Sequence, residues 1–340
     1  MTVQPGPEIW MFPNLVEASL PNYQGAVETA AAWTSPDWDA TVSRCDVLGI
    51  YVGPANNGGP TGTDGILVNL IEMANRYGRP IAIEVGAAGG SSEHPATGTA
   101  VADIDLAGYL SYINALGGTV GYLQMDGPMW RWMHNYTFDL KSTSEAAALT
   151  VEYMQAIHAV YPAIQIGLIQ TPTAFYDVSE GVTFTALMDA VAVAGETLAF
   201  HHLDHPYEQA YDPTAMPQYV NQFDYQRAMQ DASIARSVPF GFGINSHWGA
   251  GETDGSPFVD GAFTAPVTPS NEEYQRRCLW YAEVMRQQVA WGKMLAPDHL
   301  VVQGFRYYPR DMAPDTTLYT FCDTFMKCKA VFNSDIYKAL

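Results

Sequence analysis

"VGYLQMDGPMWRWMHNYTFDLKSTSEAAALTVEYMQAIHAVYPAIQIGLI", residues 120–169, contains one complete strand–helix–strand unit and decides the fold of this chain. Two apolar runs, at 120–126 and 164–169, enclose a helical pattern at 142–162 that begins with an S-x-x-E capping box at Ser142. Runs that are apolar throughout are typical of strands buried on both faces. The unit therefore predicts two parallel strands joined by a helical crossover.

The same unit recurs along the whole chain. Further strands are expected at 8–12, 46–53, 80–86, 198–204, 239–245 and 300–308, and helices at 24–34, 65–78, 101–118, 182–194, 217–236, 270–292 and 315–332. Strand and helix thus alternate eight times without a linker, and a long segment at 248–269 precedes one of the last helices. This order predicts an α/β fold, a single (β/α)8 TIM barrel over 1–340 with extended strand-to-helix loops.

An open, doubly wound parallel sheet is the alternative fold for alternating strands and helices. Such a sheet normally carries a glycine-rich dinucleotide-binding turn after its first strand. The corresponding segment here, "MFPNLVEA" at 11–18, contains no glycine. The closed barrel is therefore preferred, and no nucleotide cofactor is expected.

The composition narrows the classes of ligand. The chain has 340 residues, 48% of them hydrophobic and 12% aromatic, with 36 acidic against 16 basic residues and a net charge of −20. A surface this negative repels phosphate backbones and anionic lipids. We therefore expect neither nucleic acid nor a membrane as partner, and neutral or cationic ligands fit better.

Short sequence segments, the composition and the cysteine spacing bear on the location of the protein and on the state of its cysteines. The start, "MTVQPGPEIW", has neither a basic nor an apolar signal region, and no apolar run reaches the roughly 18 residues of a membrane span. The acidic, lysine-poor composition is common in secreted enzymes and favours a secreted or periplasmic location, while the oligomeric state stays open. The four cysteines, Cys45, Cys278, Cys322 and Cys328, lack zinc-site spacing and are expected to be buried thiols.

Three carboxylates are candidates for the chemistry, because active sites of such barrels lie at the C-terminal ends of the strands. Asp126 closes the fourth expected strand, Asp204 closes the sixth, and Glu84 lies inside the third. A carboxylate in an apolar strand is rarely buried without a partner, so Glu84 is expected to face the mouth. The alternatives are a turn in which Asp126 binds its own backbone, and a structural ion pair of Glu84 with Arg306.

Aromatic and polar side chains gather at the same strand ends. The candidate substrate-binding residues are Asn14, Tyr51, Trp130, Trp132, His202, His205, Asn245, His247, Trp248, Arg306 and Tyr307. Aromatic faces cover the apolar faces of sugar rings, and amides and carboxylates bind hydroxyl groups. The mouth therefore predicts a carbohydrate ligand.

The stretch "AFHHLDHPYEQ" (199–209) raises the question of a metal site. Neighbouring residues of a strand point to opposite faces, so His201 and His202 do not readily bind one ion. His202 and Asp204 share a face, which leaves an acid/base cluster or a polar turn. No metal ligands are assigned, and His202 or His205 is expected to tune Asp204 by hydrogen bonding.

The layout resembles the (β/α)8 glycoside hydrolases at superfamily level, on the strength of Asp126 with its tryptophan neighbours, Asp204 and the aromatic mouth. Large groups of that superfamily place glutamates after strand four and on strand seven, where this chain has Asp126 and "GINSH" (243–247). The chitinase-type D-x-x-D-x-D-x-E run is absent as well. The positions of Asp126 and Asp204 are more similar to α-glycosidase barrels, with an Asp nucleophile on strand four and an Asp acid/base on strand six.

The resulting hypothesis is a glycosidase that cleaves an oligo- or polysaccharide, with α-linked and amino-sugar substrates among those considered. Asp126 would be nucleophile or base, Asp204 the proton donor, and Glu84 the reserve for either role. Two alternatives stay open. One is a carbohydrate-binding barrel without catalysis, and the other is a metal-dependent lyase, isomerase or aldolase built on His202, Asp204 and His247.

Overall fold

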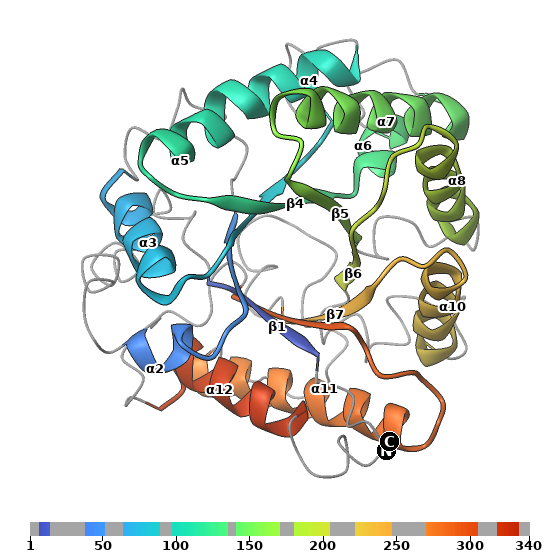
Figure 1. The fold of residues 1–340 in the computed structure, drawn as a ribbon. Helices are drawn as coiled ribbons and strands as arrows, with labels where there is room; N and C mark the ends of the chain where they lie inside the picture. Colours follow the sequence, from blue (N-terminus) through green and yellow to red (C-terminus); the bar gives the residue numbers. More distant parts are fainter. Residues whose placement is uncertain are drawn as a thin grey trace, which may run out of the picture.

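A computed structural model of the protein describes residues 7–13, 38–51, 64–88, 97–134, 141–170, 180–204, 222–246, 270–304 and 318–332. Within these residues eight strands form a closed parallel barrel in the order β1-β2-β3-β4-β5-β6-β7-β8. Figure 1 looks along this barrel and shows the helices as an outer ring around the strands. The predicted (β/α)8 barrel is confirmed.

The strands lie close to their predicted places. They are β1 (Glu8–Phe12), β2 (Val47–Tyr51), β3 (Ile81–Val85), β4 (Val120–Asp126), β5 (Gln165–Gln170), β6 (His201–Asp204), β7 (Phe240–Ile244) and β8 (His299–Gln303). The last strand ends at Gln303, five residues before its predicted end. Apolar runs therefore located every strand, although they did not fix the ends.

The helices show larger differences from the sequence pattern. They are α2 (Asp39–Val42), α3 (Asp64–Tyr77), α4 (Gly98–Asp105), the π-helix η4 (Leu106–Leu110), α5 (Ser111–Ala115), α6 (Pro128–His134), α7 (Thr143–Val160), α8 (Glu180–Val193), α10 (Gln222–Ile234), α11 (Asn271–Ala290) and α12 (Phe321–Phe332). The helix predicted at 101–118 is thus three consecutive pieces, and α2 and α6 were not predicted. The helix predicted at 24–34 lies outside the described residues. None of the helices described is long and apolar enough to cross a membrane.

Capping side chains explain where two long helices begin. At α7 the Ser142 hydroxyl accepts a hydrogen bond from the Glu145 N–H, and the Glu145 carboxylate accepts one from the Ser142 N–H at 2.9 Å. At α11 Ser270 caps the Glu273 N–H at 3.1 Å, but the Glu273 carboxylate binds Arg276 and the buried Arg277. The predicted capping box at Ser142 is complete, whereas at α11 only the Ser270 half is formed, because arginines compete for the Glu273 carboxylate.

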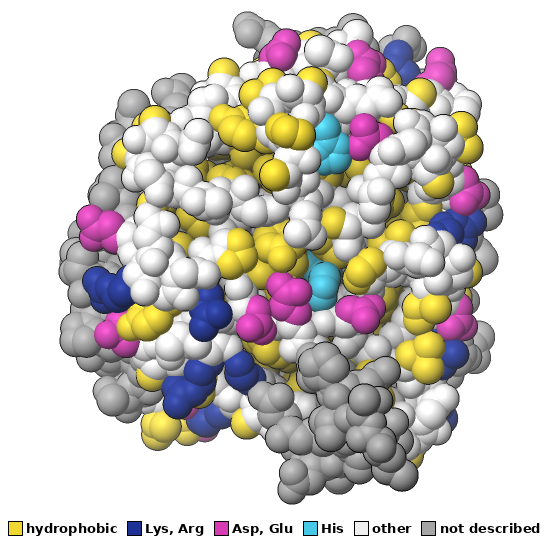
Figure 2. Space-filling model, viewed as in Figure 1, with side chains coloured by type: hydrophobic (Ala, Val, Ile, Leu, Met, Phe, Trp, Pro, Cys, Tyr) yellow, Lys and Arg dark blue, Asp and Glu magenta, His cyan; other side chains and the backbone are white. Residues whose placement is uncertain are grey.

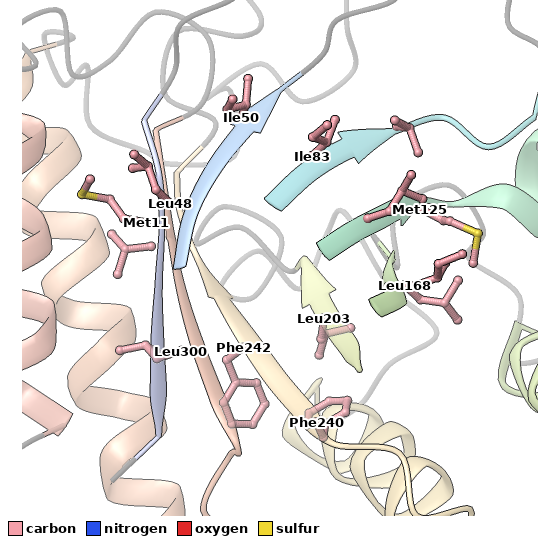
Figure 3. Packing of buried hydrophobic residues seen from close by; sticks show 14 of the residues in the cluster. Met11, Leu48, Ile50, Ile83, Met125, Leu168, Leu203, Phe240, Phe242 and Leu300 are labelled. Carbon is pink, nitrogen blue, oxygen red and sulfur yellow. The ribbon is translucent and has the colours of Figure 1, made fainter. Parts of the chain in front are cut away.

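An apolar layer between the strands and the helices forms the larger part of the core. Figure 3 shows part of this layer, with Leu48, Met125 and Phe240 on three of the strands. On the helix side the layer includes buried residues such as Met154 of α7 and Phe325 of α12. All four cysteines are buried free thiols, as expected from their spacing.

The barrel interior is filled by a few large aromatic side chains set against glycines. Trp10, Phe12 and Phe200 are fully buried there. A methyl carbon at Gly49 of β2 would lie 2.4 Å from the ring of Phe12, and one at Gly167 of β5 would lie 2.4 Å from the ring of Phe200. The rings thus occupy the volume that a side chain on the neighbouring strand would need.

This packing predicts that Gly167→Ala lowers the free energy of unfolding by about 1–3 kcal/mol, the usual range for overpacking a dense core. Urea denaturation of the two proteins measures the difference. The matched control is Gly108→Ala in η4, because a methyl carbon at Gly108 meets nothing within 4 Å. Equal stability losses in the two variants would show that the Phe200 ring adjusts without cost.

Candidate active site

Three carboxyl groups from separate strands meet at the C-terminal mouth of the barrel. Glu84 is the fourth residue of β3, Asp126 is the last of β4, and Asp204 is the last of β6. The charges of Asp126 and Asp204 both act on Glu84 and raise the pKa of its carboxyl group. The three candidate acids therefore share one electrostatic environment.

Glu84 lies deepest of the three. Burial is the first cause that raises its pKa well above the ordinary value of 4.5, followed by the charges of Asp126 and Asp204. The amide of Gln124, its partner in the β3–β4 register, donates a hydrogen bond to Glu84 Oε2 at 2.8 Å. This bond and the charge of Arg131 lower the pKa without outweighing the other causes. Glu84 thus keeps its proton to a higher pH than an exposed glutamate.

Asp126 is held by an arginine that follows it in sequence. Gly127 turns the chain from β4 into α6 with a φ of +52°, a conformation that glycine adopts readily. The first turns of α6 carry Arg131, which donates through Nε to the Asp126 backbone carbonyl at 2.8 Å and pairs through Nη2 with Asp126 Oδ2. One carboxylate oxygen, Oδ2, is therefore tied to Arg131. The proximity of an arginine to Asp126 was the missed signal.

Asp204 is positioned by the amide of Asn245, which follows the neighbouring strand β7 and is itself bonded to Gln303 at the end of β8. Asn245, just beyond β7, donates through Nδ2 to Asp204 Oδ1 at 2.6 Å and to Gln303 Oε1 at 2.9 Å. The Tyr274 hydroxyl donates to the backbone carbonyl of Gln303. Asn245 is 1% exposed, so it orients Asp204 without facing the solvent itself. Gln303 was missed, although an amide closing the apolar run "LVVQ" was visible.

His202 lies inside the barrel and contradicts the role predicted for it. Its Nδ1 is 2.7 Å from Gln124 Oε1, its Nε2 is 2.9 Å from His299 Nδ1, and it is fully buried. Both ring nitrogens are therefore engaged away from Asp204, so His202 neither tunes that carboxylate by hydrogen bonding nor lines the mouth. His201 faces outward and bonds Ser233 Oγ at 3.0 Å, which confirms that the two histidines point to opposite faces.

The two tryptophans of α6 differ in their surroundings. Trp132 packs against the apolar layer outside the barrel, and its indole Nε1 is buried. Its side chain as a whole is partly exposed, so its predicted contact with substrate stays a prediction. Trp130 is partly exposed and stays a candidate for contact with substrate.

Several predicted site residues cannot be placed. Asn14, His205, His247, Trp248, Arg306 and Tyr307 lie outside the described residues, as does the side chain of Tyr51. The same holds for the alternative ion pair of Glu84 with Arg306. Among the residues that the structure does describe, no group of three or more histidines, cysteines or acidic residues is arranged to hold a metal ion.

Comparisons with known proteins show a shared fold. No protein-family model matches the sequence, and neither does any curated protein. Native xylanase 10B from Thermotoga maritima has a TM-score of 0.54 at 8% identity, covering 96% of this chain and 95% of the xylanase. The catalytic domain of a family GH18 chitinase from the fern Peteris ryukyuensis has a TM-score of 0.51 at 10% identity, covering 96% and 100%.

One further solved structure gives a lower TM-score. Dihydropteroate synthase from Xanthomonas albilineans has a TM-score of 0.46 at 12% identity, with 97% of this chain and 93% of the synthase covered. At such identities the likeness concerns the fold alone. The chain shares its barrel fold with the xylanase and the chitinase.

The raised pKa of Glu84 predicts a pH-dependent difference in stability between the wild type and Glu84→Gln. A carboxyl group with a higher pKa in the folded state binds more protons folded than unfolded, so its contribution to stability falls as the pH rises. The fall begins near the unfolded value of about 4.5 and continues up to the raised folded pKa. Urea denaturation from pH 4 upward should show the wild type losing stability relative to Glu84→Gln. Parallel pH profiles of the two proteins would contradict the raised pKa.

Proposed function

We propose that this chain is an enzyme that hydrolyses glycosidic bonds with carboxyl groups at the barrel mouth. The observation that carries the proposal is the unequal environment of three neighbouring carboxyl groups. Burial and two nearby charges raise the pKa of Glu84, whereas Asp126 is paired with Arg131. Neighbouring acids whose environments favour different protonation states provide the acid and the base of one reaction.

In this proposal Glu84 is the proton donor. The sequence pattern had favoured Asp204 as donor and kept Glu84 in reserve. The amide N–H that Asn245 donates to Asp204 stabilises a charged carboxylate, which makes Asp204 the weaker donor. Burial acts in the opposite direction on Glu84, so its carboxyl group keeps its proton to a higher pH than an exposed glutamate does.

Asp126 keeps its predicted role as nucleophile or base. Its side chain is 34% exposed, and Arg131 binds its Oδ2. In the proposed reaction Glu84 transfers its proton to the glycosidic oxygen as the bond to the anomeric carbon breaks. Asp126 attacks that carbon or removes a proton from the attacking water. Asp204, as an anion, stabilises the positive charge that develops on the sugar ring.

The charges of the site favour a particular kind of substrate. Three acidic groups and one arginine at the mouth repel the carboxylates of acidic sugars, so neutral or amino-sugar glycans are the proposed substrates. Trp130 and Trp132 are the described aromatic candidates for stacking on a sugar ring. Tyr51, Trp248 and Tyr307 remain proposed as further aromatic contacts, and Asn14, His205, His247 and Arg306 as polar ones.

The two alternative functions, a metal-dependent enzyme and a carbohydrate-binding barrel without catalysis, require different residues from a hydrolase. A metal-dependent enzyme built on His202, Asp204 and His247 would use a ring nitrogen of His202, and both of these nitrogens are already hydrogen-bonded inside the barrel. A carbohydrate-binding barrel without catalysis needs no proton donor. The raised pKa of Glu84 favours the hydrolase over that alternative.

The test is product release from a panel of neutral and amino-sugar glycans by the wild type, Glu84→Gln and Asp126→Asn. Loss of a general acid costs about 10²–10⁴-fold in rate, so both variants should lose at least two orders of magnitude in kcat. Asp189→Asn is the control, because this carboxylate lies on α8 and pairs with Arg236. It should leave the rate unchanged.

The other outcomes separate the alternatives. Glycan binding without any product would favour the binding barrel and end the hydrolase proposal. Cleavage that survives both substitutions would move the chemistry away from Glu84 and Asp126. Cleavage abolished by a chelator and restored by a divalent metal would favour the metal-dependent class.

A further inference from the structure

A chain of polar side chains crosses the interior of the barrel. Gln124 Nε2 lies 2.8 Å from Glu84 Oε2, and Gln124 Oε1 lies 2.7 Å from His202 Nδ1. His202 Nε2 lies 2.9 Å from His299 Nδ1, and His299 Nε2 lies 3.6 Å from Glu8 Oε2. Glu84 lies at the mouth, whereas Glu8 and His299 open β1 and β8 and are partners in register. This series of side-chain contacts thus links the two ends of the barrel.

The end of the chain opposite the mouth is acidic. Figure 2 shows acidic side chains gathered around a histidine near the middle of the barrel end in view. Asp46 raises the pKa of Glu8, after the larger effect of burial, while Trp10 and Tyr122 lower it. Asp298 acts on His299. Glu8 is 35% exposed, so protons reach it from solvent.

Both histidines of the chain are neutral at ordinary pH. Burial is the main cause that holds the pKa of His202 well below its usual value, with His299 and His201 adding to it, and burial also lowers the pKa of His299 to about 4. Phe200 stacks on His202 with ring centroids 4.5 Å apart, and Trp10 stacks on His299 at 5.3 Å. Each imidazole therefore carries one N–H and one bare nitrogen.

With one N–H per ring, the contacts allow only two arrangements. In the first, His202 donates through Nδ1 to Gln124 Oε1, and its bare Nε2 accepts from His299 Nδ1–H. The bare Nε2 of His299 then faces Glu8 Oε2 at 3.6 Å, beyond hydrogen-bond length, where a charged carboxylate is unfavourable, so this arrangement favours a protonated Glu8. At the other end Gln124 donates its N–H to Glu84 and so stabilises a charged Glu84.

The second arrangement reverses every donor. The dipole of His299 Nε2–H is attracted to a charged Glu8 at 3.6 Å. His299 Nδ1 then accepts from His202 Nε2–H, and the bare Nδ1 of His202 accepts the N–H of a reversed Gln124 amide. The Gln124 oxygen then faces Glu84, which must hold a proton to donate to it. Both arrangements contain the same number of protons, with the acidic proton at Glu8 in the first and at Glu84 in the second.

We propose that His202 and His299 are positioning residues that tie the orientation of the Gln124 amide to the protonation state of Glu8, and so couple Glu8 at one end of the barrel to Glu84 at the other. The coupling rests on the geometry of three hydrogen bonds, on the 3.6 Å charge contact between His299 and Glu8, and on the single N–H of each neutral imidazole. Its consequence for catalysis rests on the proposed role of Glu84. A charged Glu8 favours a protonated Glu84, which is the form required of a proton donor.

The first test is the titration of Glu84 in the wild type and in Glu8→Gln. Glu8→Gln removes the carboxylate charge that favours the second arrangement, so the first arrangement becomes more populated. The ¹³C signal of the Glu84 carboxyl carbon, assigned by its loss in Glu84→Gln, should then titrate about one pH unit lower, the equivalent of one hydrogen bond of roughly 1.4 kcal/mol.

A double-mutant cycle separates this coupling from a simple loss of negative charge. His299→Phe keeps an aromatic ring against Trp10 but removes both ring nitrogens, so Glu8→Gln should shift the Glu84 titration far less in that background. Equal shifts in both backgrounds would overturn the proposal, because they would mean that the charge of Glu8 acts through space alone.

The second test uses the wild type only and does not depend on any variant folding. Protonated and bare imidazole nitrogens differ in ¹⁵N chemical shift, so the tautomers of His202 and His299 can be followed as Glu8 titrates. Both rings should carry their proton on Nδ1 at low pH and on Nε2 once Glu8 is charged. Tautomers that stay fixed would overturn the proposal. Neither test needs a substrate. The coupling of Glu8 to Glu84 can therefore be shown or overturned independently of the hydrolase proposal.

Discussion

The amide of Gln124 touches both the carboxyl group at the mouth and the imidazole inside the barrel. It donates to Glu84 at 2.8 Å and accepts from His202 at 2.7 Å, and it is fully buried between them. An unpaired buried amide or carboxyl group would cost about 1–3 kcal/mol, so these partners can be buried only together. The position of the Glu84 carboxyl group and the polar interior of the barrel therefore depend on this one side chain.

The position of these groups follows from how the barrel is filled. The rings of Trp10, Phe12 and Phe200 fill the interior, where glycines on neighbouring strands make room for Phe12 and Phe200. His202 packs against Trp10 and Phe200, and Gln124 joins it to Glu84, while Asp126 and Asp204 close their strands. Burial increases toward the aromatic layer, so the deepest acid, Glu84, carries the strongly raised pKa. The proposed proton donor thus owes its protonation mainly to depth.

The sequence predicted the architecture well because the signals for it are local. Apolar runs located all eight strands, and Ser142 with Glu145 located the start of α7. Placing carboxylates at strand ends also brought Asp126, Asp204 and Glu84 to one mouth, since parallel strands of a barrel all end on the same side. These predictions needed only the order of residues along single elements.

The partners of the candidate acids were not predicted because they depend on contacts across the barrel. His202 and His299 are 97 positions apart in sequence, and Asn245 reaches Asp204 from 41 positions away. Such pairs are set by strand register, which the pattern of apolar residues does not reveal. Even nearby Arg131 was missed, because the helix α6 that carries it is short and follows a turn.

The close fit between rings and glycines inside the barrel has a consequence for how this sequence can change over evolutionary time. Phe200 occupies the space that a side chain at position 167 would need, and Phe12 does the same at position 49. A larger residue at either glycine becomes tolerable only after the facing ring has become smaller. In related sequences we therefore expect each pair to covary, so that these four positions record how the barrel's ancestors were filled.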